Sequence, residues 1–158
     1  MKVKNLIIGI LALSSSFMSA QEKGQISGFG GLNYYIASGG SAIGFNVGAE
    51  YLFTDNISIA PSYTMHNTEG GDTSEINIDG RYYFVVDKQI NWFAVAGYRS
   101  FSQSAQGQPS VTSGGFSAGA GGLYKISDKL SIVAQAKYGS VKLLSGTNIL
   151  AGIQYAFN

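Results

Sequence analysis

The stretch Ala42-Ile-Gly-Phe-Asn-Val-Gly-Ala-Glu-Tyr-Leu-Phe53 alternates between two kinds of side chain. Every second residue from Phe45 to Phe53 is apolar or aromatic, and the residues between them are mostly small or polar. A period of two places successive side chains on opposite faces of an extended chain, so the pattern predicts a β-strand with one apolar face.

The same alternation recurs along the rest of the chain. In the segment 75–84 the residues Ile76, Ile78, Tyr82 and Phe84 share one face, and in 130–139 the apolar face begins at Leu130. Applied throughout, the pattern predicts eight strands. They cover residues 25–36, 42–53, 57–66, 75–84, 90–100, 114–126, 130–139 and 147–157.

The connections between these strands alternate in length. Residues 54–56, 85–89 and 127–129 form short connections with Asp, Asn or Ser, which favour chain reversal by hydrogen-bonding to their own backbone. The other connections are mostly longer and rich in Gly, Ser and Gln; they cover residues 37–41, 67–74, 101–113 and 140–146. We therefore expect an antiparallel up-and-down sheet with short turns at one end and longer loops at the other.

The composition excludes several classes of protein. Charged residues make up only 12% of the 158 residues, against about 25% in soluble globular proteins, while hydrophobic residues make up 45%. The net charge of +1 lacks the basic field of a nucleic-acid-binding protein. The absence of cysteine excludes disulfides and thiolate metal sites, and the single histidine, His66, excludes a multi-histidine metal site.

The first 20 residues have the layout of a secretory signal peptide. Lys2 and Lys4 precede an apolar run from Leu6 to Leu13, and a serine-rich segment follows up to Ala20. The apolar run is too short for a transmembrane helix, which needs about 20 residues. We expect cleavage after Ala20, so that residues 1–20 are the signal peptide and 21–158 form the barrel domain.

The polar faces of the strands decide between a barrel with an apolar interior and one with an apolar exterior. A soluble barrel would expose many Lys and Glu side chains, but here the polar faces carry mainly Gly, Ser, Asn, Gln and Tyr. The strand charges fall on this side too, so we expect them inside. In 90–100 the pattern is ambiguous, and Trp92 is placed outward partly because this keeps Arg99 inside. The predicted polar network of the lumen comprises Glu50, Asp79, Arg81, Arg99 and Lys137.

Outward-facing aromatic residues form two predicted girdles, as expected where rings meet a membrane interface. The girdle near the short turns comprises Tyr51, Phe53, Tyr82, Phe84, Trp92, Tyr124, Tyr155 and Phe157. The girdle near the loops comprises Tyr34, Tyr63, Tyr98, Phe116 and Tyr138. In lipid the sheet must close, because an open edge would leave backbone groups without hydrogen bonds.

Four segments resemble the small eight-stranded outer-membrane β-barrels of the OmpA and OmpX type. They are Gly28-Phe-Gly-Gly-Leu-Asn-Tyr-Tyr35, Gly48-Ala-Glu-Tyr-Leu-Phe-Thr-Asp-Asn-Ile57, Gly115-Phe-Ser-Ala-Gly-Ala-Gly-Gly-Leu-Tyr124 and Gly152-Ile-Gln-Tyr-Ala-Phe157. The resemblance implies an all-β transmembrane barrel in a Gram-negative outer membrane, with turns in the periplasm and loops outside. It also implies insertion by the barrel-assembly machinery, which reads a terminal aromatic residue; here Phe157 is penultimate.

Eight strands enclose an interior that side chains can fill, so an open pore is not expected. We expect Glu50 to pair with Arg81 near the turns, and Asp79 to lie nearer Lys137 and Arg99, because an unpaired buried charge is costly. The predicted function is therefore a non-enzymatic membrane scaffold whose external loops contact the surroundings. The alternative is a narrow porin-like channel for small or hydrophobic solutes.

A lipid A-modifying enzyme is a third possibility, and it depends on His66. A nucleophilic serine needs a histidine within hydrogen-bonding reach. Glu69 and Asp72 could orient His66, although a polar residue at the barrel rim is the simpler interpretation. We predict no catalytic residue, no cofactor and no metal site, because the carboxylates Glu69, Asp72 and Glu75 lack the dense oxygen set of a calcium loop.

The predicted partners are outer-membrane lipid and lipopolysaccharide, and no nucleic acid. Residues 101–113, which form the longest predicted loop, are the candidate surface for an external ligand. The sequence names neither that ligand nor an oligomeric state.

Overall fold

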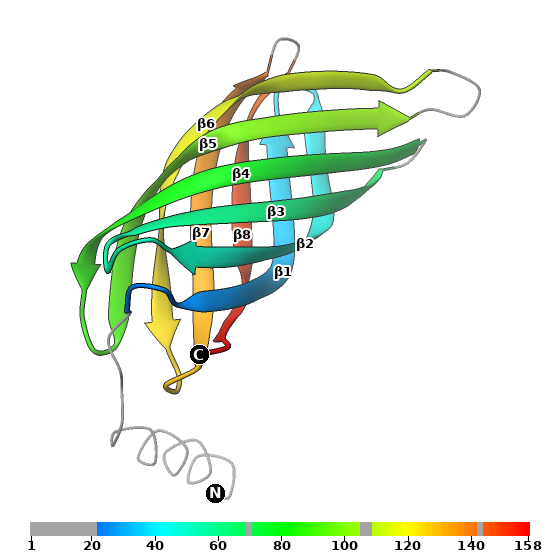
Figure 1. Ribbon diagram of the computed structural model, residues 1–158. Helices are drawn as coiled ribbons and strands as arrows, with labels where there is room; N and C mark the ends of the chain where they lie inside the picture. The colour runs from blue at the N-terminus through cyan, green and yellow to red at the C-terminus, as the bar shows by residue number, and fades with distance from the viewer. Residues whose placement is uncertain (1–21, 69–70, 105–108, 142–143) are drawn as a thin grey trace, which may run out of the picture.

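The computed structural model is a single barrel of eight β-strands (Figure 1). It describes residues 22–68, 71–104, 109–141 and 144–158. The strands are β1 (Ile26–Ala37), β2 (Gly40–Leu52), β3 (Ile57–Thr68), β4 (Gly71–Val86), β5 (Ile90–Ser104), β6 (Val111–Lys125), β7 (Leu130–Val141) and β8 (Leu144–Ala156). The predicted signal peptide, residues 1–20, lies outside the described residues.

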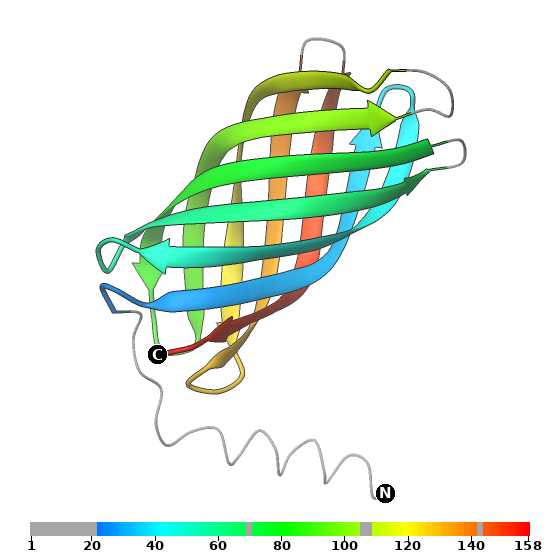
Figure 2. The same ribbon diagram turned by 45° about the vertical axis from the view of Figure 1, so that its right-hand side comes forward.

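The sheet is closed, which confirms the predicted fold class. Each strand pairs antiparallel with the next, and β1 pairs with β8 from Ser27↔Ala156 to Ala37↔Gly146. The strands run obliquely around the barrel, and the start of β1 lies beside the end of β8 (Figure 2). We call the end with connections 53–56, 87–89 and 126–129 the turn end, and the opposite end the loop end. No helix in the described part of the chain is long and apolar enough to cross a membrane.

The strands extend further toward the loop end than the sequence predicted. Residues 67–74 were predicted to be a loop, but β3 continues to Thr68 and β4 begins at Gly71. Residues 101–113 likewise belong mostly to β5 and β6, so that only 105–110 join the two strands. The prediction relied on apolar alternation, which ends where the outward residues become Ser and Thr, whereas the backbone pairing continues beyond that point.

The outward face of the barrel is apolar and the inward face is closed off from solvent. In β5, Trp92 is 49% exposed while Phe93 is fully buried, so the phase of 90–100 is the one that the sequence predicted. Both predicted aromatic girdles are exposed on the outer wall. A register shift between Tyr83 and Val85 turns both Phe84 and Val85 outward at the turn end.

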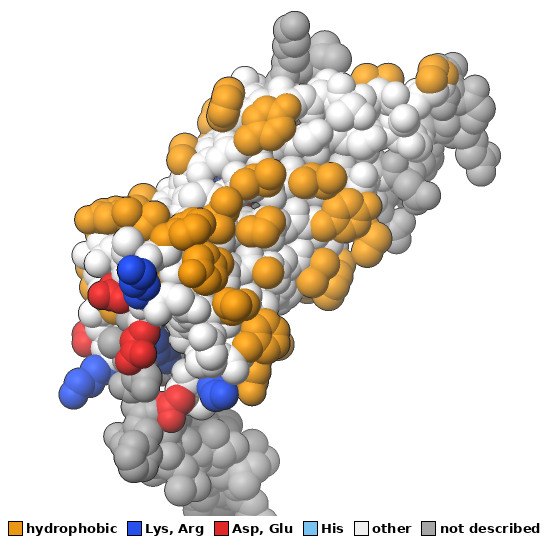
Figure 3. All heavy atoms as spheres, viewed as in Figure 1, with side chains coloured by type: hydrophobic (Ala, Val, Ile, Leu, Met, Phe, Trp, Pro, Cys, Tyr) orange, Lys and Arg blue, Asp and Glu red, His pale blue; other side chains and the backbone are white. Residues whose placement is uncertain are grey.

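Charged side chains on the outside gather at the turn end (Figure 3). In the described part of the chain the exposed charges are those of Glu22, Lys23, Asp55, Asp87, Lys88, Asp128 and Lys129. All of them lie in the turns or in the segment before β1, so the outward wall of the strands carries no described charge.

The seam between β1 and β8 depends on two facing glycines. Gly31 lies opposite Gly152. A Cβ atom on Gly152 would lie 2.1 Å from the carbonyl oxygen of Gly30, and one on Gly31 would lie 2.2 Å from that of Ala151. Because these neighbours are backbone atoms, a side chain here would force the two strands apart.

We predict that Gly152→Ala destabilises the folded barrel by about 1–3 kcal/mol, the usual effect of overpacking. The matched control is Gly80→Ala, since a Cβ atom there meets nothing closer than 3.6 Å. The measurement is the free energy of unfolding in urea of each variant, folded in lipid vesicles. Equal values for the two variants would contradict the role of the glycine pair.

Candidate functional site

Alternate residues of every strand point into the barrel, so the interior is the candidate site. Near the turn end Glu50 on β2 faces Arg81 on β4, with 3.1 Å between Oε2 and Nη1. Ser58 and Tyr83 donate hydrogen bonds to the other carboxylate oxygen, and Gln154 on β8 donates to Oε2 at 2.6 Å. Both charged groups are fully enclosed, and four strands contribute to the pair and its hydrogen bonds.

The guanidinium group of Arg81 also lies between two aromatic rings. Its central carbon is 4.8 Å from the ring centre of Phe29 and 4.7 Å from that of Phe93. Desolvated contacts of a cation with ring faces are stabilising, by about 2 kcal/mol or more in favourable cases. Arg81 and these two rings therefore pack together in the interior of the barrel at this level.

An apolar cluster lies at the same end of the interior, although the sequence predicted a polar lumen. It consists of Tyr83, Phe93, Val95, Leu123 and Val133. These residues occupy the face that the sequence analysis assigned to polar side chains, and a scan for alternation alone does not single them out. The interior is therefore part polar network and part apolar core.

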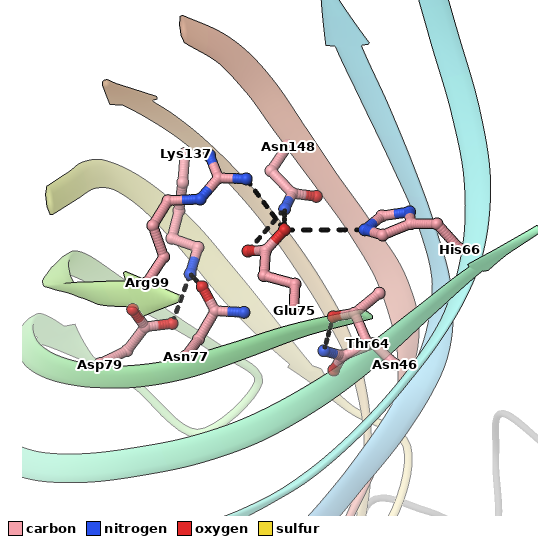
Figure 4. A network of polar contacts seen from close by, with 9 residues as sticks. All are labelled: Asn46, Thr64, His66, Glu75, Asn77, Asp79, Arg99, Lys137 and Asn148. Carbon is pink, nitrogen blue, oxygen red and sulfur yellow. Dashed lines mark hydrogen bonds and ion pairs between the residues drawn. The ribbon is translucent and has the colours of Figure 1, made fainter. Parts of the chain in front are cut away.

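A second ion pair lies closer to the loop end (Figure 4). Lys137 on β7 donates to Asp79 on β4 at 2.6 Å and to Asn77 at 3.2 Å. The Lys137 and Asp79 side chains are 5% and 3% exposed. The pair joins strands from opposite sides of the barrel.

The third ion pair differs from the sequence prediction. Arg99 contacts Glu75 at 2.8 Å, whereas it was expected to lie near Asp79. Glu75 was predicted as the first residue of the strand 75–84 and was grouped with Glu69 and Asp72 as a carboxylate near the loop. It is instead a fully buried residue well inside β4, because that strand begins at Gly71. Asn148 donates to both oxygens of Glu75 at 3.4 Å. Glu69 and the side chain of Asp72 lie outside the described residues.

His66 lies inside the barrel beside Glu75 (Figure 4). It is 4% exposed, and its Nε2 atom is 3.6 Å from a carboxylate oxygen of Glu75. Tyr35 and Phe101 flank the ring at 6.1 and 6.2 Å between centres. Neither ring nitrogen has a hydrogen-bond partner among the described residues, so no described serine is held in position for proton transfer to His66. No group of three or more metal-ligating side chains occurs in the described part of the chain.

Two small cavities lie among the described interior residues. A cavity of about 10 Å³ lies between Phe29, Asp79, Arg81 and Lys137, and another of about 20 Å³ lies near Ser27 and Lys125. A single water needs roughly 10–15 Å³ of such space. A shallow groove of about 480 Å³ lies instead on the outer wall over β5–β8, where small outward residues such as Ala120 and Ala134 leave room.

Comparisons with known proteins find solved structures with a similar fold. No protein-family model and no curated protein matches the chain. The N-terminal β-barrel domain of Pseudomonas aeruginosa OprF matches with a TM-score of 0.67 and 15% identity, covering 88% of this chain and 100% of that one. The chain has the fold of the small transmembrane β-barrels.

Two further structures support that assignment of the fold. The outer membrane protein OprG from Pseudomonas aeruginosa has a TM-score of 0.67 and 10% identity, with 90% of this chain and 100% of that one covered. The attachment invasion locus protein Ail of Yersinia pestis has a TM-score of 0.60 and 20% identity, with 85% and 99% covered. These neighbours are outer-membrane β-barrel proteins, in agreement with the resemblance of the sequence to that class.

We predict that Arg81→Met destabilises the barrel by about 3–5 kcal/mol, because Glu50 is left buried without its cation. Adding Glu50→Gln removes the unpaired charge and should restore a large part of the lost stability. The free energy of unfolding in urea reports both effects, and Lys88→Met in an exposed turn serves as the control. A double variant no more stable than Arg81→Met alone would show that the pair does not act as a unit.

Proposed function

We propose that this protein is a non-enzymatic outer-membrane β-barrel that acts as a closed scaffold for its external segments. The observation that carries the proposal is the filled interior. Three ion pairs, Arg81 between two rings and an apolar cluster occupy the described lumen, and cavities of only about 10 and 20 Å³ lie among them. Such an interior supports a plug, because paired charges and packed rings from several strands lie across it.

A membrane location follows from the distribution of side chains. The exposed wall carries large apolar residues on every strand and no described charge, and two aromatic girdles border it. Closure of the sheet satisfies the backbone groups of every strand without water, as lipid requires. We propose the bacterial outer membrane as the location, reached through the signal peptide 1–20, with the turn end in the periplasm and insertion by the barrel-assembly machinery.

The two alternatives find less support. A channel for small or hydrophobic solutes needs an open or apolar lumen, and the paired charges and small cavities do not provide one. A lipid A-modifying enzyme needs a histidine that can reach lipid on the outer wall, whereas His66 faces the interior beside Glu75. The scaffold is therefore the function that the geometry supports best.

The charges at the loop end bear on the kind of ligand that this end can bind. Ail of Yersinia pestis has been solved with sucrose octasulfate, a heparin analogue. In the present chain every described Lys and Arg is either buried or at the turn end, so the described loop end offers no cation to a sulfated ligand. We propose that contacts at this end, to lipopolysaccharide or another surface, are made by uncharged groups.

We predict that the purified protein, folded into a planar bilayer, gives no stable open channel. The Glu50–Arg81 layer and the two layers beyond it must all part before an ion can cross. Single-channel recording tests this, and a heat-modifiable gel-mobility shift of the same sample verifies that the barrel is folded. Long-lived open channels would overturn the proposed plug.

We also predict that an arginine on the outer wall is tolerated only outside the membrane. Ala120→Arg lies midway along the outward face of β6 and should destabilise the barrel by about 2–4 kcal/mol in lipid vesicles. Ser102→Arg, outward but beyond the loop-end girdle, should cost about 1 kcal/mol or less. If both variants unfold at the same urea concentration, the wall does not face lipid.

A further inference from the structure

The outward face of β4, β5 and β6 changes its chemistry abruptly near the loop end. The paired residues Ile78, Tyr98 and Phe116 form the last fully apolar row. The next row contains Ile76, Ser100 and Gly114, and the row after that contains Ser74, Ser102 and Thr112. Within two rows the wall passes from apolar side chains to hydroxyl groups, while the sheet itself continues without a break.

Hydroxyl groups surround the ring pair of Tyr98 and Phe116 on two sides. We call the residues Ser74, Ser100, Ser102, Thr112, Ser140 and Ser145 the hydroxyl rim. Thr112 donates to Ser102 across the strands at 3.4 Å, and Ser145 donates to Ser140 at 3.3 Å. Neighbouring strands lie about 4.8 Å apart, so the rim presents donors and acceptors at regular intervals.

The aromatic rings below the rim are held out toward the surroundings. Phe116 is 75% exposed, the largest exposed fraction among the large apolar side chains that the structure describes, and Tyr98 packs edge-on against it at 5.7 Å. Gly114 makes this arrangement possible, because a Cβ atom there would lie 1.8 Å from the Tyr98 hydroxyl oxygen. Gly114 therefore leaves room for the Tyr98 ring, which packs against Phe116 at the boundary between the apolar wall and the hydroxyl rim.

The rim has no described charge, so its chemistry does not suit a phosphate or sulfate group. Exposed rings stack against the apolar C–H faces of sugars, and hydroxyl groups exchange hydrogen bonds with sugar hydroxyls. The position matters as well, since the rim continues the lipid-facing wall directly beyond its girdle. A ligand that contacts the rim would therefore lie in the head-group layer of the membrane around the barrel.

We propose that the hydroxyl rim, with Tyr98 and Phe116, binds neutral sugar rings of the glycolipid that surrounds the barrel in the outer leaflet. This inference rests on the proposed membrane function and names the partner of the loop end. The rings stack on a sugar face, and the rim hydroxyls fix its orientation. The contact holds the hairpin β5–β6 in the head-group layer without any ion pair.

The test uses the full-length folded protein in phospholipid nanodiscs that contain either rough lipopolysaccharide or its lipid A part, which lacks the core sugars. Amide NMR signals of residues 100–102 and 112–116 should shift with the core sugars and not with lipid A alone. Removing the phosphates from the core should leave the shifts in place. The single variants Phe116→Leu and Ser102→Ala should each reduce the apparent affinity of the protein for rough lipopolysaccharide by about fivefold. This is the effect expected from the loss of one ring contact or one hydrogen bond.

The controls make the same chemical changes elsewhere on the barrel. Phe84→Leu alters the turn-end girdle, and Ser41→Ala removes an outward hydroxyl at the loop end of β2; both should retain the shifts. Identical spectra in the two nanodiscs, shifts that vanish with the phosphates, or equal shifts in Phe116→Leu would overturn the sugar site. A protein that gives no dispersed β-strand spectrum in nanodiscs would instead count against the proposed membrane function.

Discussion

The pairing of β1 with β8 is the constraint on which the rest of the structure depends. Without it the sheet would have two edges, and each edge would leave a row of backbone N–H and C=O groups that lipid cannot satisfy. Closure leaves no such edge, and it requires close backbone approach at the Gly31 and Gly152 positions. The high glycine content, 22 residues in the whole chain, is consistent with strands that curve sharply into a small barrel.

Closure also determines where charge can lie. Where the outer wall faces lipid, each charged residue of a strand must point inward, where another side chain can compensate it. Three carboxylates and three cations accordingly meet in pairs, at 3.1, 2.6 and 2.8 Å. The pairs join β2 to β4, β4 to β7 and β4 to β5, so β4 contributes to every one of them. The ion pairs in the interior are thus a consequence of a narrow barrel whose apolar face points outward.

Sequence reasoning predicted the fold because alternation reports directly on which face meets an apolar medium. It placed Glu50 opposite Arg81 and Asp79 toward Lys137, since both pairs lie in strands with a clear phase. It began the strand at Glu75 and grouped that residue with the carboxylates near the loop, because the first residues of β4 have no apolar alternation to mark them. It therefore missed the contact of Arg99 with Glu75 and the burial of His66 beside it, both of which depend on how far β3 and β4 extend. It also missed the inward cluster around Phe93. Where apolar residues lie on both faces of a strand, the sequence no longer alternates between apolar and polar residues.

The extension of the strands beyond the apolar band has a physical consequence for the loop end. Backbone pairing of β4, β5 and β6 continues past Tyr98 and Phe116, so the outward residues there are held on a sheet rather than on a loop. A rigid sheet fixes the spacing of Ser74, Ser102 and Thr112, and fixed groups lose less conformational entropy on contact with a ligand. The hydroxyl rim is therefore better suited to weak, repeated contacts with uncharged head groups than an unstructured loop of the same composition would be.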